Sequence, residues 1–182
     1  MELTYRQFEY KNDIDWLYNV YSNPQETMMF LHDFRFSTRE EFEKVFLQRV
    51  LNDYYSFLVI CDNDGTPLGI VYGHDYSAND LHIKFSLYVL PKYRSLGVGA
   101  IAAIYFVDSV FKTLPVRKVY ETVFEDNKVS LKNNLQAGFV REATLKEYLF
   151  VNGKFCDLIY LSVTRKRFYD LYGNSPLLQC KD

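Results

Sequence analysis

A strand, a glycine-containing loop and an almost wholly apolar helix follow one another in the middle of the 182-residue chain. The strand is predicted over residues 81–90 and ends at Pro91, and apolar residues then occupy nearly every face of a helix predicted over 97–111. A helix with this pattern is buried inside a protein. Other elements must therefore cover it on several sides, which predicts a layered domain of helices and strands.

Polar turns and helix-start signals divide the rest of the chain. Asp62-Asn63-Asp64-Gly65 and Asn152-Gly153 each separate two apolar runs, as hairpin turns do. Three places carry residues that are typical of a helix start: Asn12 and Asp13, the capping box from Ser37 to Glu40, and Asn127. The predicted strands are 3–8, 56–61, 68–72, 81–90, 116–123, 148–151 and 155–161, and the predicted helices are 14–22, 37–51, 97–111 and 127–137.

This order of elements combines β-hairpins with one β-α-β crossover. It predicts an α/β (α+β) fold with a mixed, mostly antiparallel central sheet of about seven strands, flanked by about four helices. The length suits one domain, so we expect residues 1–182 to form a single domain, with 165–182 as a C-terminal tail.

Composition excludes several classes of protein. The formal net charge is −2, so the basic excess that nucleic-acid binding needs is absent and nucleic acid is not expected as the main partner. The longest apolar run, 100–107, is far shorter than a membrane span, and residues 1–10 do not resemble a signal peptide. Three cysteines show neither paired nor metal-type spacing. We expect a cytoplasmic protein without a membrane or a metal site.

The loop before the central helix has the residues of an anion site. Arg94 precedes Gly97 and Gly99, and Lys92 adds a second cation nearby. The first amides of a helix have no partners within the helix, and glycines let a ligand approach them closely. This pattern predicts a site for a pyrophosphate. Alternatively, the two glycines only shape a tight turn between the strand and the helix.

A dinucleotide-binding site is a second alternative for the same loop. Gly97-x-Gly99-x-x-Ala102 fits the dinucleotide fingerprint, and Glu121 follows on the next strand, where an acid would bind the ribose. However, residues 91–96 separate the strand end from the first glycine, and a second β-α-β half is not predicted. A nucleotide-dependent oxidoreductase is therefore the less favoured interpretation.

Three sequence blocks together resemble the GNAT superfamily of N-acetyltransferases. The first is Arg94-x-x-Gly97-x-Gly99-Ala100 after a strand that ends in Pro91. The second is Asn127-x-x-Ser130 followed by Ala137-Gly138-Phe139. The third runs from Glu147-Tyr148 through Asn152-Gly153-Lys154 to Tyr160-Leu161-Ser162, and is similar to the branch that contains ribosomal-protein N-terminal and spermidine acetyltransferases.

The resemblance implies an acyl-CoA-dependent N-acetyltransferase with acetyl-CoA as co-substrate. In this superfamily the strand before the loop splays from the next parallel strand, and the pantetheine arm lies between them. Carried over by position, the cofactor-binding residues are Leu87, Val89, Arg94, Ser95, Leu96, Gly97, Val98, Gly99, Ala100, Asn127 and Ser130. The implied mechanism is direct attack of a neutral amine on the thioester in a ternary complex, with the Val89 amide as a donor to the oxyanion.

The resemblance does not supply the usual proton-transfer residues. Asn134 stands where relatives often carry an acidic tyrosine, and Lys84 stands roughly where a strand carboxylate often acts as the base. Substitute candidates are His82 and Glu121, which with Asn134 form the predicted catalytic set, and also His74 and Asp75. A catalytically weak acyl-CoA-binding sensor or scaffold with the same fold is therefore an alternative.

The expected acceptor is a primary amine, either a small amine such as a polyamine or a protein N-terminus. We expect its pocket to be formed by the first two helices, a neighbouring strand and the last hairpin, with Tyr21, Phe30, His32 and Tyr148 as substrate-binding residues. The edge strands of the last hairpin could pair between subunits, so a homodimer is a possible assembly.

Overall fold

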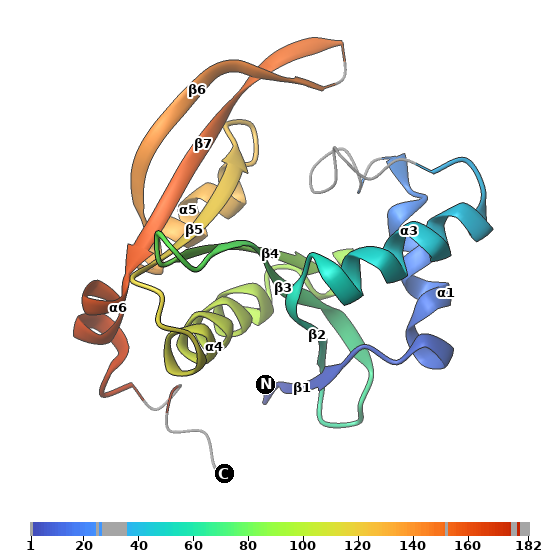
Figure 1. The fold of residues 1–182 in the computed structure, drawn as a ribbon, viewed down its shortest axis with the longest axis horizontal. Helices are drawn as coiled ribbons and strands as arrows, with labels where there is room; N and C mark the ends of the chain where they lie inside the picture. The colour runs from blue at the N-terminus through green and yellow to red at the C-terminus, as the bar shows by residue number, and fades with distance from the viewer. Residues whose placement is uncertain (1, 25, 27–35, 152, 176–177, 179–182) are drawn as a thin grey trace.

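A seven-stranded mixed sheet with helices on both faces forms the body of the protein (Figure 1). The computed structural model describes residues 2–24, 26, 36–151, 153–175 and 178. The strand order across the sheet is β1-β2-β3-β4-β5-β7-β6. The strands are β1 (Thr4–Gln7), β2 (Tyr55–Cys61), β3 (Pro67–Ser77), β4 (His82–Val89), β5 (Lys118–Phe124), β6 (Val140–Val151) and β7 (Lys154–Thr164). The α-helices are α1 (Tyr10–Tyr21), α3 (Arg39–Asn52), α4 (Val98–Thr113), α5 (Lys128–Gln136) and α6 (Arg165–Tyr172), and a short 3₁₀ turn spans Pro91–Tyr93.

Two of the strands, β4 and β5, run parallel and then separate. Their pairing comprises His82 with Lys118, Ile83 with Val119 and Lys84 with Tyr120. Past Lys84 and Tyr120 no further pair joins these two strands in the described residues. The other neighbouring strands are antiparallel. The predicted mixed sheet is therefore confirmed, and it is open along one line between its two halves.

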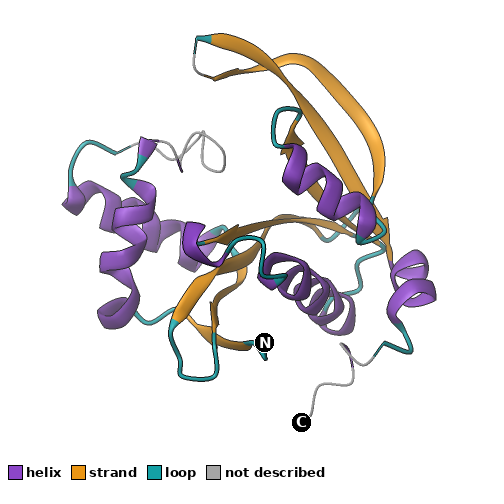
Figure 2. Ribbon diagram, turned by 180° about the vertical axis from the view of Figure 1, so that it is seen from behind, coloured by secondary structure: helices purple, strands orange, loops and turns teal. Residues whose placement is uncertain are grey.

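Alternating side chains of the strands build two cores, one on each face of the sheet. On β2, Leu58 and Ile60 belong to the core that α4 fills, whereas Phe57, Val59 and Cys61 belong to the core under α1 and α3. Figure 2 shows the same arrangement from behind, with α4 and α5 in front of the sheet. The separated halves of β4 and β5 are thus held in place by packing rather than by a continuous ladder.

Two helix starts differ from the prediction because the capping groups lie elsewhere. α1 begins at Tyr10, before the predicted cap, since the Asp13 carboxylate accepts from the Glu9 amide at 2.8 Å and from Arg6 at 2.7 Å. α3 is capped by Thr38, whose hydroxyl accepts from the Glu41 amide at 3.1 Å. The capping box is therefore shifted by one residue from the predicted Ser37–Glu40 pair.

The segment predicted as a C-terminal tail begins with a helix. In α6 the Phe168 side chain is buried, and the Arg165 guanidinium donates to the carbonyls of Leu114 and Val116 at 2.7 and 2.9 Å. This helix was not predicted, because a helix of only eight residues leaves a weak pattern in the sequence. In the part of the chain that is described, the helices are too short or too polar to cross a membrane.

Candidate active site

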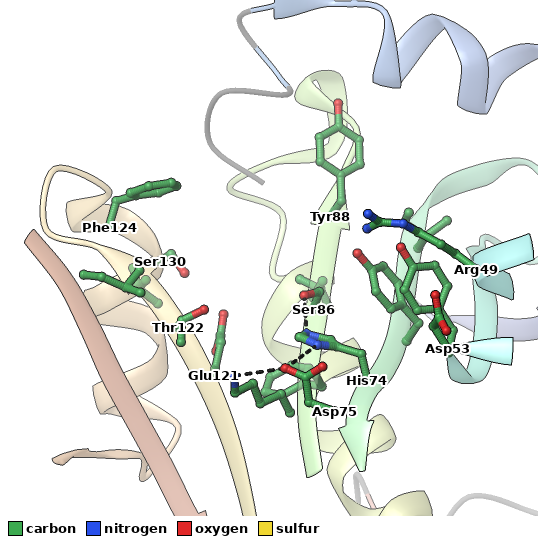
Figure 3. Close-up of a pocket in the computed structure, with 18 of the residues that line it drawn as sticks. Arg49, Asp53, His74, Asp75, Ser86, Tyr88, Glu121, Thr122, Phe124 and Ser130 are labelled. Atoms are coloured by element: carbon green, nitrogen blue, oxygen red, sulfur yellow. Dashed lines mark hydrogen bonds and ion pairs between the residues drawn. The ribbon is translucent and has the colours of Figure 1, made fainter. Parts of the chain in front are cut away.

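A cavity of about 890 Å³ opens where β4 and β5 separate (Figure 3). One wall is formed by β4 and β3, and the opposite wall by β5 and the start of α5. The side chains of α1 and α3 and of the loop after α3 enclose one end, and the β6–β7 hairpin contributes Tyr148 and Tyr160 at another. The splayed strands thus create one space that can hold two ligands side by side.

The exposed edge of β4 presents backbone groups to this space. The Leu90 amide donates to the Leu68 carbonyl on β3 at 2.8 Å. Because successive residues of an antiparallel strand direct their N–H and C=O groups to opposite sides, the backbone groups of Leu87 and Val89 point away from β3 and towards the gap. This is the arrangement expected for two residues that bind the amides of an extended ligand.

The loop after β4 has the backbone geometry of an anion site. Gly97 has a φ of 81°, in the left-handed region that favours glycine, and it precedes α4 without a side-chain cap. The first intrahelical bond runs from the Ile101 amide to the Gly97 carbonyl at 3.1 Å. A Cβ on Gly99 would lie 3.4 Å from the Leu87 side chain and 3.6 Å from Val89, so this turn lies against the edge of β4. The arrangement fits a pyrophosphate at the helix start.

Arg94 has partners of its own. Its Nε donates to the Val89 carbonyl at 2.9 Å, and a terminal nitrogen lies 2.5 Å from Glu26. The guanidinium also lies over the Tyr88 ring. Arg94 therefore links the end of β4 to the segment after α1, and it would have to share or exchange these contacts to bind a phosphate.

On the opposite wall, α5 places Asn127, Ser130 and Asn134 along one side. The Asn127 side chain caps the helix by accepting from the Ser130 amide at 3.1 Å, as the sequence predicted. The buried Asn134 amide group donates to the Ser130 carbonyl and hydroxyl at 3.0 and 3.2 Å. Asn127 and Ser130 line the cavity.

Glu121 and Asn134, both predicted from the sequence, lie together beside the cavity. Burial raises the pKa of the Glu121 carboxyl to about 8, although a hydrogen bond from Asn134 opposes the shift. Within the described residues, Oε2 of Glu121 has no hydrogen-bond partner. The group is therefore largely protonated at neutral pH, with a pKa close to that of a thiol.

A second polar cluster lies on the wall formed by β3 and β4. The His74 Nε2 lies 3.1 Å from the Ser86 hydroxyl, and its Nδ1 lies 3.5 Å from Asp75. Asp75 also accepts from Lys84 at 3.0 Å. Burial lowers the pKa of His74, and Lys84 adds to this while Asp75 opposes it. His74 is therefore a neutral imidazole near pH 7.

His82, by contrast, lies away from the cavity. It is at the beginning of β4, with its ring edge-on to Tyr120. The structure therefore brings together Glu121 and Asn134 of the predicted catalytic set but not His82. Ser86 lines the cavity, on the strand face that alternation assigns to it together with Lys84, although the sequence suggested no role for it. Tyr72, which also lines the cavity, was missed.

The end of the cavity near α1 and α3 has aromatic walls. Tyr21, predicted as a substrate-binding residue, is 3% exposed and lines the cavity with Tyr54 and Tyr72. Tyr54 and Tyr72 lie with their ring centres 4.3 Å apart. Tyr148, also predicted, lines the cavity from the hairpin. The other two predicted residues, Phe30 and His32, lie outside the described residues.

Comparisons with known proteins agree with this geometry. The acetyltransferase (GNAT) domain family matches residues 2–140. Spermidine N(1)-acetyltransferase of Vibrio cholerae is 20% identical over 167 residues, which cover 92% of this chain and 95% of the relative. The N-acetyltransferase YokL of Bacillus subtilis, which is encoded by a prophage, is 24% identical over 66% of this chain and 68% of the relative.

A solved structure shares the same fold. The crystal structure of the Vibrio cholerae spermidine N-acetyltransferase in complex with CoA and spermine has a TM-score of 0.82 and 20% identity, covering 91% of this chain and 97% of that one. The predicted acetyltransferase class, with acetyl-CoA as co-substrate, is confirmed at the level of the family, and an oxidoreductase is not supported. The chain belongs to the GNAT family of acetyltransferases.

Proposed function

We propose that this enzyme transfers an acetyl group from acetyl-CoA to a primary amine of a polyamine. The observation that carries the proposal is the cavity between β4 and β5, which has a backbone-lined edge on one side and an acidic, aromatic end on the other. The backbone-lined edge suits the pantetheine arm of the cofactor. The acidic, aromatic end, which we call the acceptor half of the cavity, suits a cationic amine.

The cofactor would lie along the edge of β4. Leu87 and Val89 would bind the pantetheine amides, and the segment from Arg94 to Ala100 would hold the pyrophosphate at the start of α4. Asn127 and Ser130 would line the thioester end. The Val89 amide, which points into the gap, is the proposed donor to the oxyanion that forms when the amine attacks.

The charges and rings around the other half favour a polycationic amine over a peptide N-terminus. Acidic side chains outnumber basic ones in the cavity wall, and phenol rings offer cation–π contacts to ammonium groups. The charged acids are Glu26, Asp53 and Asp75, since Glu121 is largely protonated, and the bases are Arg49 and Lys84. The phenols include Tyr21, Tyr54, Tyr72, Tyr88 and Tyr148. The relatives named for spermidine acetylation support the same acceptor class.

A polyamine acceptor must lose a proton before its nitrogen can attack the thioester. An alkylamine with a pKa of about 10.4 is mostly protonated at neutral pH, and its deprotonation costs roughly 4–5 kcal/mol. The leaving thiol has a pKa of about 8.5, so protonation of the thiolate is less demanding. The larger task for the protein is therefore to accept a proton from the amine.

Thiol release from acetyl-CoA tests the proposal. Spermidine and spermine are compared with a monoamine of similar chain length and with a peptide that has a free N-terminus. We expect the highest kcat/KM with the polyamines, because only they carry several positive charges. CoA binding without transfer to any acceptor would instead indicate a sensor, and transfer only to the peptide would refute the acceptor class.

A further inference from the structure

His74 and Ser86 are a hydrogen-bonded pair on the cavity wall that belongs to the acceptor half. Tyr72 pairs with Ser86 and His74 pairs with Lys84 across β3 and β4, so all four side chains lie on one face of the sheet. The His74 Nε2 and the Ser86 Oγ are 3.1 Å apart (Figure 3). Ser86 directly precedes Leu87, whose backbone faces the cofactor side of the gap. The hydroxyl is thus placed between the two halves of the cavity.

An irregularity in β3 brings an acid beside the imidazole. Asp75 has a φ of 50°, and the register between β3 and β4 shifts between His74 and Ser77. A non-glycine residue in this region is strained and is stabilised by its surroundings. The bulge turns the Asp75 carboxylate back along the strand, to 3.5 Å from the His74 Nδ1 and 3.0 Å from the Lys84 ammonium.

This arrangement selects one tautomer of His74. A carboxylate is only an acceptor, so the nitrogen that faces Asp75 carries the proton. Nε2 is then an acceptor and receives the Ser86 hydroxyl. A hydroxyl oxygen accepts two hydrogen bonds while it donates one, so Ser86 can accept from a bound amine at the same time as it donates to His74.

Burial lowers the pKa of His74 and keeps it neutral before the reaction, and the charged and titratable groups around it do not reverse this. Asp75 and Tyr72 lie on its own strand, Lys84 on β4, and Tyr54, Asp53, Arg49 and Glu121 face it from the other walls of the cavity. Lys84 stays charged and pairs with Asp75: burial opposes its charge, but the hydrogen bond and charge attraction of Asp75, together with Tyr160, outweigh burial and raise the pKa of Lys84. Asp75 raises the pKa of His74, but burial and Lys84 outweigh it, so the imidazole is neutral and can take up a proton.

We propose that Ser86 and His74 together form the proton-accepting site for the acceptor amine. This inference rests on the proposed acetyl transfer. The ammonium first gives one proton to the Ser86 oxygen while the Ser86 proton passes to the His74 Nε2, and His74 releases this proton to solvent. The neutral amine then bonds to the thioester carbon, which forms the oxyanion intermediate. The extra proton on the bonded nitrogen leaves by the same Ser86–His74 route. The intermediate collapses with cleavage of the C–S bond, CoA leaves as the thiolate, and His74 returns its proton to solvent.

The test compares initial rates and pH profiles of His74→Gln, Ser86→Ala and Ser86→Thr with the best acceptor of the amine panel. His74→Gln should lower kcat about a hundredfold or more and remove the acidic limb of the kcat/KM profile. Ser86→Ala should lower kcat by a smaller factor, and Ser86→Thr should restore it because the hydroxyl returns. An amine of lower pKa should reduce the loss in His74→Gln.

Further measurements separate this role from a structural one. His74→Ala should regain activity with added imidazole, and all variants should keep the CoA affinity and unfolding temperature of the wild type. His82→Gln is the control variant, because His82 lies away from the cavity. The assignment is overturned if His82→Gln lowers kcat while His74→Gln leaves both kcat and the pH profile unchanged. Wild-type enzyme that transfers acetyl to no amine refutes the proposed function, and this inference with it.

Discussion

Arg94 and Glu26, which are 68 residues apart in the sequence, form an ion pair with 2.5 Å between the guanidinium and the carboxylate. The pair joins the segment after α1 to the loop that precedes α4. Arg94 is also the proposed ligand of the pyrophosphate, so the carboxylate and the phosphates compete for one guanidinium. Binding of CoA should therefore depend on both residues, in opposite directions.

The first prediction concerns this competition. Arg94→Ala should weaken CoA binding about tenfold or more, the size of a lost hydrogen bond to a charged group. Glu26→Gln should strengthen it, because the guanidinium is released from the carboxylate. Titration calorimetry with CoA measures both effects. Weaker binding by a folded Glu26→Gln variant would show that Glu26 positions Arg94 rather than competing for it.

The second prediction concerns Gly99 at the start of α4. Gly99→Glu should abolish CoA binding, because a carboxylate would stand where the pyrophosphate is expected. Gly99→Ala is the matched control, since its Cβ would meet Leu87 and Val89 only at ordinary contact distances. The alanine variant should therefore fold normally and still bind CoA. If the folded glutamate variant bound CoA as tightly as the wild type, the pyrophosphate would have to lie elsewhere.

The third prediction concerns the pH dependence of stability. The Glu121 carboxyl has its pKa raised by burial to about 8, so the folded protein holds a proton that the unfolded chain releases near its ordinary pKa. The free energy of unfolding should therefore fall as pH rises from about 4.5 to 8. Glu121→Gln removes this dependence. The unfolding temperature of the variant minus that of the wild type should therefore increase between pH 5 and pH 8. An equal difference at both pH values would contradict the assigned protonation.

The fourth prediction concerns the buried end of α1. Burial opposes ionisation of Asp13, but hydrogen bonds from Arg6, the Glu9 amide and Trp16 outweigh it and lower its pKa. Asp13→Asn should cost about 3 kcal/mol, near the low end for a buried pair because Arg6 is partly exposed. The contribution of Asp13 is present above the pKa of an unfolded aspartate and is lost as pH falls through the folded pKa.

Asp15→Asn is the control for this comparison. Asp15 lies in the same helix and pairs with Arg39, but its side chain is 74% exposed. Exposed pairs contribute less than about 1 kcal/mol, so urea unfolding should show little change. Similar losses in the two variants would indicate that burial does not determine the cost.

Local signals in the sequence located most of the elements and the glycine-containing loop before α4. Gly97 adopts a left-handed conformation between the strand and the helix, where a tight turn was predicted, and Asn127 caps α5 through its own side chain as predicted. The hairpins and the central buried helix also lie where turn residues and apolar periodicity placed them. These features depend on neighbours a few residues away, which the order of the amino acids specifies directly.

The arrangement of polar groups in the acceptor half of the cavity could not be predicted, because it depends on contacts between segments that are distant in the sequence. The strand predicted over 68–72 continues to Ser77, which places His74 beside Ser86, and the bulge at Asp75 brings a carboxylate to the other side of the imidazole. Glu121 meets Asn134 across two elements. By itself the sequence determined the fold class and the tight turn before α4, because these follow from local conformation. Strand register and packing decided which polar groups meet, because pairing between distant segments is fixed only when the sheet closes around its core.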